Sequence, residues 1–243
     1  MDLKYSLKSY IENFSTALSF ALLFVFVLPI LWFSGSFMSS GTIFLDYGFI
    51  KLPFFDAILL LGLSIAFLFF YSILICLMVF AVRRDMNKVR LNYYLAEKIH
   101  KFGLKYFYFV AIFTIVSVII VPFLISYGIP TFAINIFIGV FSLLFFFLPQ
   151  TLVVDEESLR SSILSNWEFM LKNPKDVLTV FLFGFFAVLI IQLFEFAVDY
   201  FFLIGNYFSL FIALVFLVPF LEVMKTRIYM NRFAIVKNYN PGE

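Results

Sequence analysis

The stretch that decides the fold runs from Val153 to Asp176 and reads VVDEESLRSSILSNWEFMLKNPKD. It is the longest polar interruption in the second half of a chain that is otherwise almost continuously apolar. Its apolar residues recur with the spacing of one helical face, at Leu159, Ile163, Trp167 and Leu171. The opposite face carries Arg160, Ser165 and Glu168. The stretch therefore predicts an amphipathic helix that lies at a membrane surface between two apolar runs.

The composition requires a bilayer as the solvent for most of the chain. Of the 243 residues, 64% are hydrophobic and only 13% are charged, and the mean hydropathy is +1.06. Ordinary soluble domains are about 45–50% apolar and about 25% charged, so a soluble fold of this length could not enclose these residues. The single cysteine, Cys76, lies inside an apolar run and gives no information on redox compartment.

Six apolar runs are long enough to cross a hydrocarbon core as helices, which takes about 17–25 residues. They cover residues 17–33, 54–82, 104–125, 131–153, 177–204 and 207–224. Because none has the strict alternation of a barrel strand, we predict an all-α polytopic membrane protein with six transmembrane helices. A signal peptide is the alternative interpretation of the first run, but its length and the lack of an A-x-A site favour a retained helix.

Lysine and arginine gather on one side of these spans. The amino terminus, the second and fourth loops and the tail carry nearly all of them, whereas the other side has only Lys51. The positive-inside rule therefore predicts cytoplasmic termini in a multi-pass protein of the cell membrane. In the second loop, the basic residues that would suit anionic lipid headgroups are Arg83, Arg84, Lys88 and Arg90. Determination of topology alone explains the same residues.

A weak internal repeat appears in the segments that precede alternate spans. An apolar stripe at helical spacing precedes the first span, within residues 3–14, and another precedes the third, within residues 91–102. With the opening stretch, these predict up to three amphipathic interfacial helices on the cytoplasmic side, each followed by a hairpin of two spans. The chain is then a single transmembrane domain of residues 1–243, divided into three units, at 1–82, 83–152 and 153–227.

The corner after the opening stretch has strong local signals. Asn173 precedes Pro174, and a residue before proline avoids the helical region, so the amphipathic helix is predicted to end there. Asn173 can then cap the fifth span, with Pro174 at its first position and Asp176 in its first turn.

Motifs for catalysis and for metal binding are missing from the sequence. His100 is the only histidine, and there is no HExxH, CxxC, GxSxG or glycine-rich phosphate loop. We therefore predict no enzyme activity, no metal and no cofactor. Nucleic-acid binding has no support beyond the basic second loop, so we predict none.

The most unusual polar residues within a span are Gln192, Glu195 and Asp199, which share one helical face at spacing i, i+3, i+7. Carboxylates inside a membrane are costly and often functional, so one interpretation is a site that relays protons or cations through Glu195. The alternative is that the fifth span ends early and these residues are solvated. Glu222 and Lys225, at the end of the sixth span, predict an interfacial ion pair.

Two segments resemble a loose group of prokaryotic six-helix membrane proteins. VVDEESLRSSILSNWEFMLKNP (residues 153–174) resembles the segment after their fourth span, and VPFLEVMKTRIYMNRF (residues 218–233) resembles their last span and the polar turn that follows. The group includes the membrane domain found with some glycerophosphodiester phosphodiesterases and several uncharacterised families. The resemblance implies an integral membrane domain, sometimes coupled to a separate enzyme, and it transfers no catalytic residues.

Together these patterns predict a membrane scaffold or accessory subunit, without enzymatic activity, that binds lipid or a protein partner, including a second copy of itself, at its cytoplasmic face. The alternative is a small transporter or permease with a polar site around Glu195, and an intramembrane enzyme comes third. A transporter should have a polar cavity that reaches the middle of the membrane and is lined by Glu195 or Gln192. A scaffold should have a closed interior packed with aromatic side chains.

Overall fold

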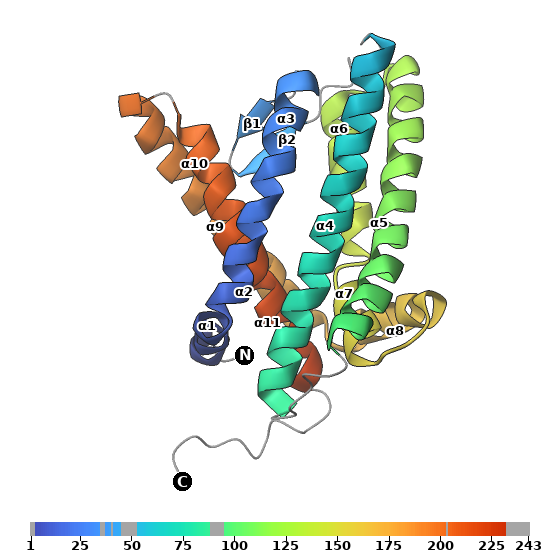
Figure 1. Ribbon diagram of the computed structural model, residues 1–243, viewed down its shortest axis with the longest axis vertical. Helices are drawn as coiled ribbons and strands as arrows, with labels where there is room; N and C mark the ends of the chain where they lie inside the picture. The colour runs from blue at the N-terminus through green and yellow to red at the C-terminus, as the bar shows by residue number, and fades with distance from the viewer. Residues whose placement is uncertain are drawn as a thin grey trace.

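The structure is a computed structural model that describes residues 3–34, 37–39, 41–44, 53–87, 95–202 and 204–231. Within this described part, six helical segments are long and apolar enough to cross a membrane, which confirms the all-α class and the six predicted spans. These segments are Phe14–Phe33, Phe54–Met86, Lys98–Ser126, Phe132–Val154, Pro174–Phe202 and Gly205–Asn231. The chain is therefore an integral membrane protein of the multi-pass type (Figure 1).

The first half of the chain contains one surface helix and three spans. The surface helix is α1 (Leu3–Glu12). The first span consists of α2 (Phe14–Leu18), a 3₁₀ turn (Ser19–Leu23) and α3 (Phe24–Ser34). A small antiparallel hairpin follows, formed by β1 (Phe37–Ser39) and β2 (Thr42–Phe44), with Phe37 opposite Phe44. The second and third spans are the long helices α4 (Phe54–Asn87) and α5 (Leu95–Ser126).

The second half contains a second surface helix and three spans, two of which are irregular. The fourth span is broken into α6 (Thr131–Leu143) and α7 (Leu148–Val154). The surface helix α8 (Leu159–Lys172) follows, and the fifth span is α9 (Pro174–Phe202). The sixth span joins α10 (Gly205–Ile212), a π-helical turn (Ala213–Leu217) and α11 (Val218–Asn231).

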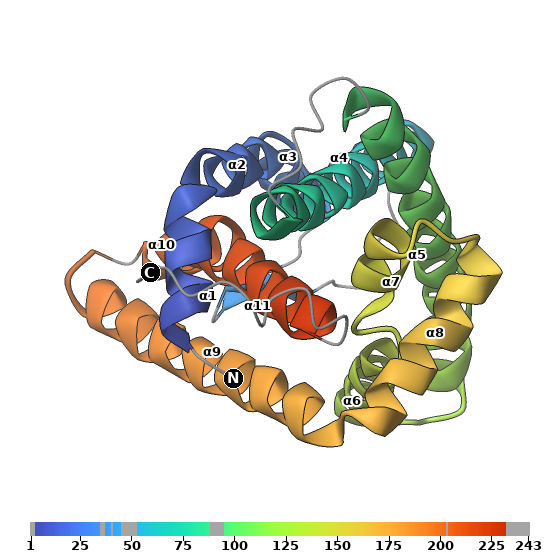
Figure 2. The same ribbon diagram turned by 90° about the horizontal axis from the view of Figure 1, so that it is seen from below.

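Helix α11 lies at the centre, and the other helices are arranged around it, with α4 between α3 and α5 (Figure 2). Half of the most apolar window of α4 is buried inside the protein (50%), and so is 61% of that of the sixth span. The third and fifth spans bury only 6% and 11% of theirs, so α5 and α9 present most of their surface to the surroundings. The largest core cluster joins the first span, α4 and the sixth span, and includes Phe20, Leu23, Ile75, Met78 and Leu214.

Both surface helices lie at one end of the bundle, together with the last residues of α4 and α11 and the first residues of α5 (Figure 1). We call this the α8 end. The first and last described helices, α1 and α11, meet there, as expected for a chain that crosses the membrane six times. The assignment of this end to the cytoplasm stays a prediction from the distribution of basic residues.

The predicted corner between α8 and α9 is confirmed. Helix α8 ends at Lys172 and α9 begins at Pro174, with Asp176 in its first turn. The Asn173 carbonyl accepts hydrogen bonds from the backbone N–H groups of Asp176 (3.1 Å) and Val177 (3.2 Å). One residue therefore ends the surface helix and supplies the first acceptor of the fifth span.

The second predicted surface helix does not form as a separate element. Residues 95–102 are the first turns of α5, which continues without a break to Ser126. No proline interrupts these turns, and Gly103 lets the helix approach α4 closely, since an added Cβ would lie 3.2 Å from Ile73 Cγ1. Leu91, in the same predicted stripe, lies outside the described residues. The division of the chain into three units stays a prediction.

Candidate functional site

The fourth span is interrupted at residues 144–147, directly before Pro149, and the freed backbone groups bind side chains of α8. The Leu144 carbonyl accepts hydrogen bonds from Asn166 Nδ2 (2.7 Å) and from Trp167 Nε1 (2.9 Å). The Phe147 N–H donates to Asn166 Oδ1 at 2.9 Å. Backbone polar groups cannot remain unpaired in a membrane, so α8 completes the bonding of the broken span.

A buried ion pair lies behind this break. Lys225 Nζ is 2.5 Å from Glu222 Oε1, and the two side chains are each 7% exposed. Lys225 also donates to the Phe146 carbonyl at 3.1 Å, and Gln150 Nε2 donates to the other Glu222 oxygen at 2.7 Å. The predicted ion pair therefore forms, and it is buried inside the protein. It can be buried because each charge has its opposite and a further hydrogen-bond partner.

Helix α8 buries two neutral polar residues against the bundle, while its charged residues Arg160, Glu168 and Lys172 are exposed. Ser162, Asn166 and Phe169 are buried. On the outer side Leu164, Trp167 and Leu171 are 58%, 41% and 82% exposed, and these three residues form what we call the α8 stripe. Two other residues of the predicted apolar face, Leu159 and Ile163, are half-buried. Asn166 points inward because the broken span supplies its hydrogen-bond partners.

Helix α1 has the same inverted orientation. Its polar residues Ser6, Ser9 and Asn13 are buried, whereas Leu3 and Leu7 are exposed. The pair Ser9 and Asn13 has the same spacing of four residues as the buried pair of α8. Asn13, directly after α1, donates through Nδ2 to Asp85 of α4, so each surface helix is tied to the bundle by an asparagine and leaves leucines outside.

Tyr10 of α1 supplies a hydrogen bond that an irregular span lacks. Pro219 has no N–H for the carbonyl four residues earlier, at Val215, and Tyr10 donates its hydroxyl to that carbonyl at 3.3 Å. Burial raises the pKa of Tyr10 to about 12, so the hydroxyl stays protonated and remains a donor. Each surface helix thus satisfies a carbonyl near a proline of a returning span.

The loop between α7 and α8 is held by basic residues of two spans. Glu156 Oε1 accepts hydrogen bonds from Arg83 Nη1 (2.8 Å) and Lys98 Nζ (2.7 Å). Arg83 also donates to the Val153 carbonyl at 2.9 Å. Glu156 itself has a left-handed backbone, with φ of 57°, which a loop adopts only when its surroundings hold it. In the sequence, Arg83 is a candidate for binding lipid headgroups. In the structure its guanidinium forms hydrogen bonds within the protein instead.

The other basic candidates have different positions. Arg84 Nε lies 3.5 Å from Asp85 Oδ1, and its side chain is partly exposed. Lys88 and Arg90 lie outside the described residues. A headgroup site on this cluster stays a prediction.

Low pH is expected to weaken the hydrogen bonds that fix the loop between α7 and α8. Burial opposes ionisation of Glu156, but hydrogen bonds from Lys98 and Arg83 outweigh it and lower the pKa of this carboxyl. A lowered folded-state pKa stabilises the protein above the unfolded-state pKa, and the benefit is lost as pH falls through the folded-state pKa. From about pH 6 to about pH 3, the melting temperature of Glu156→Gln should therefore fall less than that of the wild type, by about 2–4 °C.

Thermal melts in detergent at several pH values measure this difference. Glu168→Gln is the control, because Glu168 is exposed and pairs with Lys172 on the same helix. Equal acid sensitivity of Glu156→Gln and the wild type would show that the loop is held by other contacts.

The three polar residues of the fifth span do not converge on one site. Gln192 is exposed and Glu195 is buried. Asp199 Oδ1 accepts a hydrogen bond from the N–H of Gly205 at 2.6 Å, which fixes the turn into the sixth span. Gly205 is required there because an added Cβ would collide with the carbonyl of Glu195. Asp199 thus has a structural partner, and the transport role of the set stays a prediction.

Two pockets formed by described residues lie at the α8 end, and neither is lined by the polar residues of the fifth span. One is an apolar groove of about 270 Å³ between the broken span, α8 and α9. The other, under α1, is charged and is described below. In the described part of the chain, no three His, Cys, Asp or Glu side chains gather as metal ligands. His100 is exposed on α5, and Cys76 is a buried free thiol.

The geometry of the α8 end consists of two surface helices that complete two irregular spans by hydrogen bonding. Comparison of the chain with protein-family models, with curated proteins and with solved structures found no match in any of the three. The resemblance to six-helix membrane proteins stays an expectation. The protein is a multi-pass integral membrane protein, and its function has to be inferred from the geometry of this end.

Proposed function

We propose that this protein is a membrane scaffold or accessory subunit without enzymatic activity, which binds lipid or a protein partner at its cytoplasmic face through the α8 stripe. The observation that carries the proposal is the inverted orientation of α8. The buried Asn166 holds the helix on the bundle through hydrogen bonds, and the α8 stripe, with Leu171 82% exposed, lies on the outer side. A helix that needed only to cover the bundle would bury its leucines instead.

Helix α8 is capped at both ends and attached to the bundle in the middle, which favours recognition. Ser158 caps the amino end by accepting a hydrogen bond from the Ser161 N–H at 3.3 Å. Asn166 binds the broken span in the middle, and at the other end Asn173 Nδ2 donates to the Phe169 carbonyl at 3.0 Å. A surface fixed in this way loses little conformational entropy on binding.

Aromatic packing behind the stripe supports a scaffold over a channel. Phe109 and Phe113 of α5 pack against Phe145 and Phe141 of the fourth span, with centroid separations of 4.8 and 5.7 Å. The Trp167 ring follows, 6.1 Å from that of Phe145. These rings join α5, the broken span and α8 into one rigid unit.

Photo-crosslinking in living cells tests the proposal and separates the two kinds of partner. A photoreactive amino acid replaces Leu171 in one variant and Leu193 in another, since both leucines are exposed but only the first lies on the α8 stripe. We expect position 171 to capture one discrete protein or one enriched lipid class, and position 193 to capture bulk lipid. Leu164→Ala should reduce the specific capture about tenfold, which is the effect of losing about 1.4 kcal/mol. Identical captures at both positions would contradict the proposal.

A further inference from the structure

The charged pocket is lined by residues of α1, a helix that lies on the opposite side of α11 from α8 (Figure 2). It has a volume of about 70 Å³ and is formed by residues of α1, α4 and α11, namely Tyr5, Lys8, Ser9, Glu12, Asp85, Met86 and Arg227. One water molecule needs about 10–15 Å³, so the pocket has room for a small polar group and none for an acyl chain. The site is separate from the α8 stripe and does not depend on the function proposed for it.

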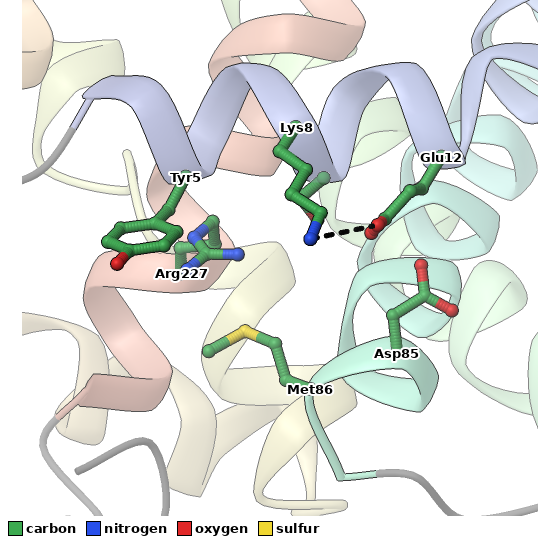
Figure 3. Close-up of a pocket in the computed structure, with 7 residues that line it drawn as sticks. Tyr5, Lys8, Glu12, Asp85, Met86 and Arg227 are labelled. Carbon is green, nitrogen blue, oxygen red and sulfur yellow. Dashed lines mark ion pairs between the residues drawn. The ribbon is translucent and has the colours of Figure 1, made fainter. Parts of the chain in front are cut away.

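Opposite charges lie at opposite sides of this pocket. In Figure 3, Tyr5 and Arg227 lie at one side, and Glu12 and Asp85 lie at the other. Lys8 lies between them, and its Nζ is 3.9 Å from Glu12 Oε1, a long separation for an ion pair. A ligand with one charge would meet a repulsive neighbour at one of the sides. A zwitterion would match both.

A buried hydroxyl in the lining supplies an independent sign of a ligand. Ser9 is 2% exposed, and its Oγ has no hydrogen-bond partner within the described residues. A buried polar atom without a partner destabilises the fold, so such atoms are uncommon unless something binds them. Ser9 also lines the pocket, so a rotation of its hydroxyl toward the pocket would let a bound polar group supply the missing partner.

The depth of the pocket points to the headgroup region of a membrane. Asp85 and Met86 end the second span, and Arg227 lies one turn before the end of the sixth. Polar headgroups occupy this depth, just outside the hydrocarbon core.

We propose that this pocket binds a phosphoethanolamine group, with its phosphate toward Arg227 and Lys8 and its ammonium toward Glu12 and Asp85. A guanidinium suits phosphate oxygens, and carboxylates accept hydrogen bonds from the N–H groups of a primary ammonium. A quaternary ammonium would need an aromatic cage instead, and the one ring of the lining, Tyr5, already has the Arg227 guanidinium over it at 5.7 Å. The group could come from a phospholipid or from soluble O-phosphoethanolamine.

Native mass spectrometry of the purified full-length protein in detergent tests the proposal. The protein is titrated separately with phosphatidylethanolamine, phosphatidylcholine and phosphatidylglycerol of the same acyl chains. We expect phosphatidylethanolamine to bind at least about tenfold more tightly than the other two, because only it satisfies both sides of the pocket. Glu12→Gln should weaken that binding about tenfold, since a hydrogen bond to a charged group is lost. Glu12 is half-exposed, so this change should leave the fold intact.

Glu168→Gln is the matched control, because Glu168 also pairs with a lysine four residues away on a surface helix but lies outside the pocket. It should bind like the wild type. Competition by soluble O-phosphoethanolamine would identify the headgroup as sufficient, whereas its failure beside selective lipid binding would identify the phospholipid as the source. Either result supports the proposal. Equal binding of phosphatidylglycerol and phosphatidylethanolamine, or equal affinities of Glu12→Gln and Glu168→Gln, would overturn it.

Discussion

Replacement of Lys225 by methionine is expected to lower the free energy of unfolding by about 3–5 kcal/mol. Methionine retains most of the length of the lysine side chain, but it leaves the Glu222 carboxylate buried without its cation. It also removes the donor to the Phe146 carbonyl, which belongs to the broken span. The loss is large because a buried charge cannot recover its hydration when its partner disappears. Chemical denaturation in detergent, followed by circular dichroism, measures the change.

Two further variants separate charge burial from loss of packing. Lys172→Met breaks the pair with Glu168, whose side chains are 69% and 64% exposed, and should cost less than about 1 kcal/mol. The double variant Lys225→Met with Glu222→Gln should regain much of the stability lost in Lys225→Met, because no uncompensated charge remains. If Lys225→Met were as mild as Lys172→Met, the ion pair would contribute nothing to this end of the bundle.

Local patterns were sufficient for the spans and for the corner at Pro174. A run of apolar residues enters the bilayer because of its own hydrophobicity, and a proline restricts the backbone of the residue before it. Neither effect depends on the rest of the fold. The prediction of a separate second surface helix was wrong, because no residue that ends a helix follows its apolar stripe. Without a proline or a capping residue near Phe102, the helix simply continues into α5.

The orientation of α8 required contacts that are distant in the sequence. Periodicity shows which residues share a helical face, but it does not show which face meets the protein. The orientation of α8 is set by the hydrogen bond between Asn166 and the backbone of Phe147, which is 19 positions away in the sequence. Pro149 was the available signal, since a proline in a span implies carbonyls or N–H groups in need of partners. Together with Ser162 and Asn166 on one face, it could have predicted a polar side turned inward.

The burial of the ion pair, and the different exposure of the polar residues of the fifth span, could not be predicted for a similar reason. Glu222 and Lys225 share a face near the end of a span, which is compatible with exposure until Gln150, 72 positions away, is placed beside them. Gln192 and Glu195 also share a face, but one is exposed and the other is covered near the turn at Gly205. Burial therefore changes within a single turn of α9, which spacing alone does not reveal.

Replacement of Asn166 by alanine is expected to cost about 2–4 kcal/mol and to loosen α8 before the spans unfold. The change leaves the Phe147 N–H buried without an acceptor and takes one of two donors from the Leu144 carbonyl. Each buried polar group left without a partner costs about 1–3 kcal/mol. Trp167→Phe should cost less than Asn166→Ala, because it removes only the other donor of Leu144 and retains the aromatic ring.

The two changes together should cost more than the sum of their separate effects, since the Leu144 carbonyl then loses both donors. Hydrogen exchange read by mass spectrometry should show loss of protection across residues 159–172 in the double variant, while α9 remains protected. That pattern would mean that hydrogen bonds to the broken span, and not apolar packing, hold the helix that presents the α8 stripe. If α8 stayed protected, the contact of Phe169 with Tyr229, at a centroid separation of 4.8 Å, would be the stronger attachment.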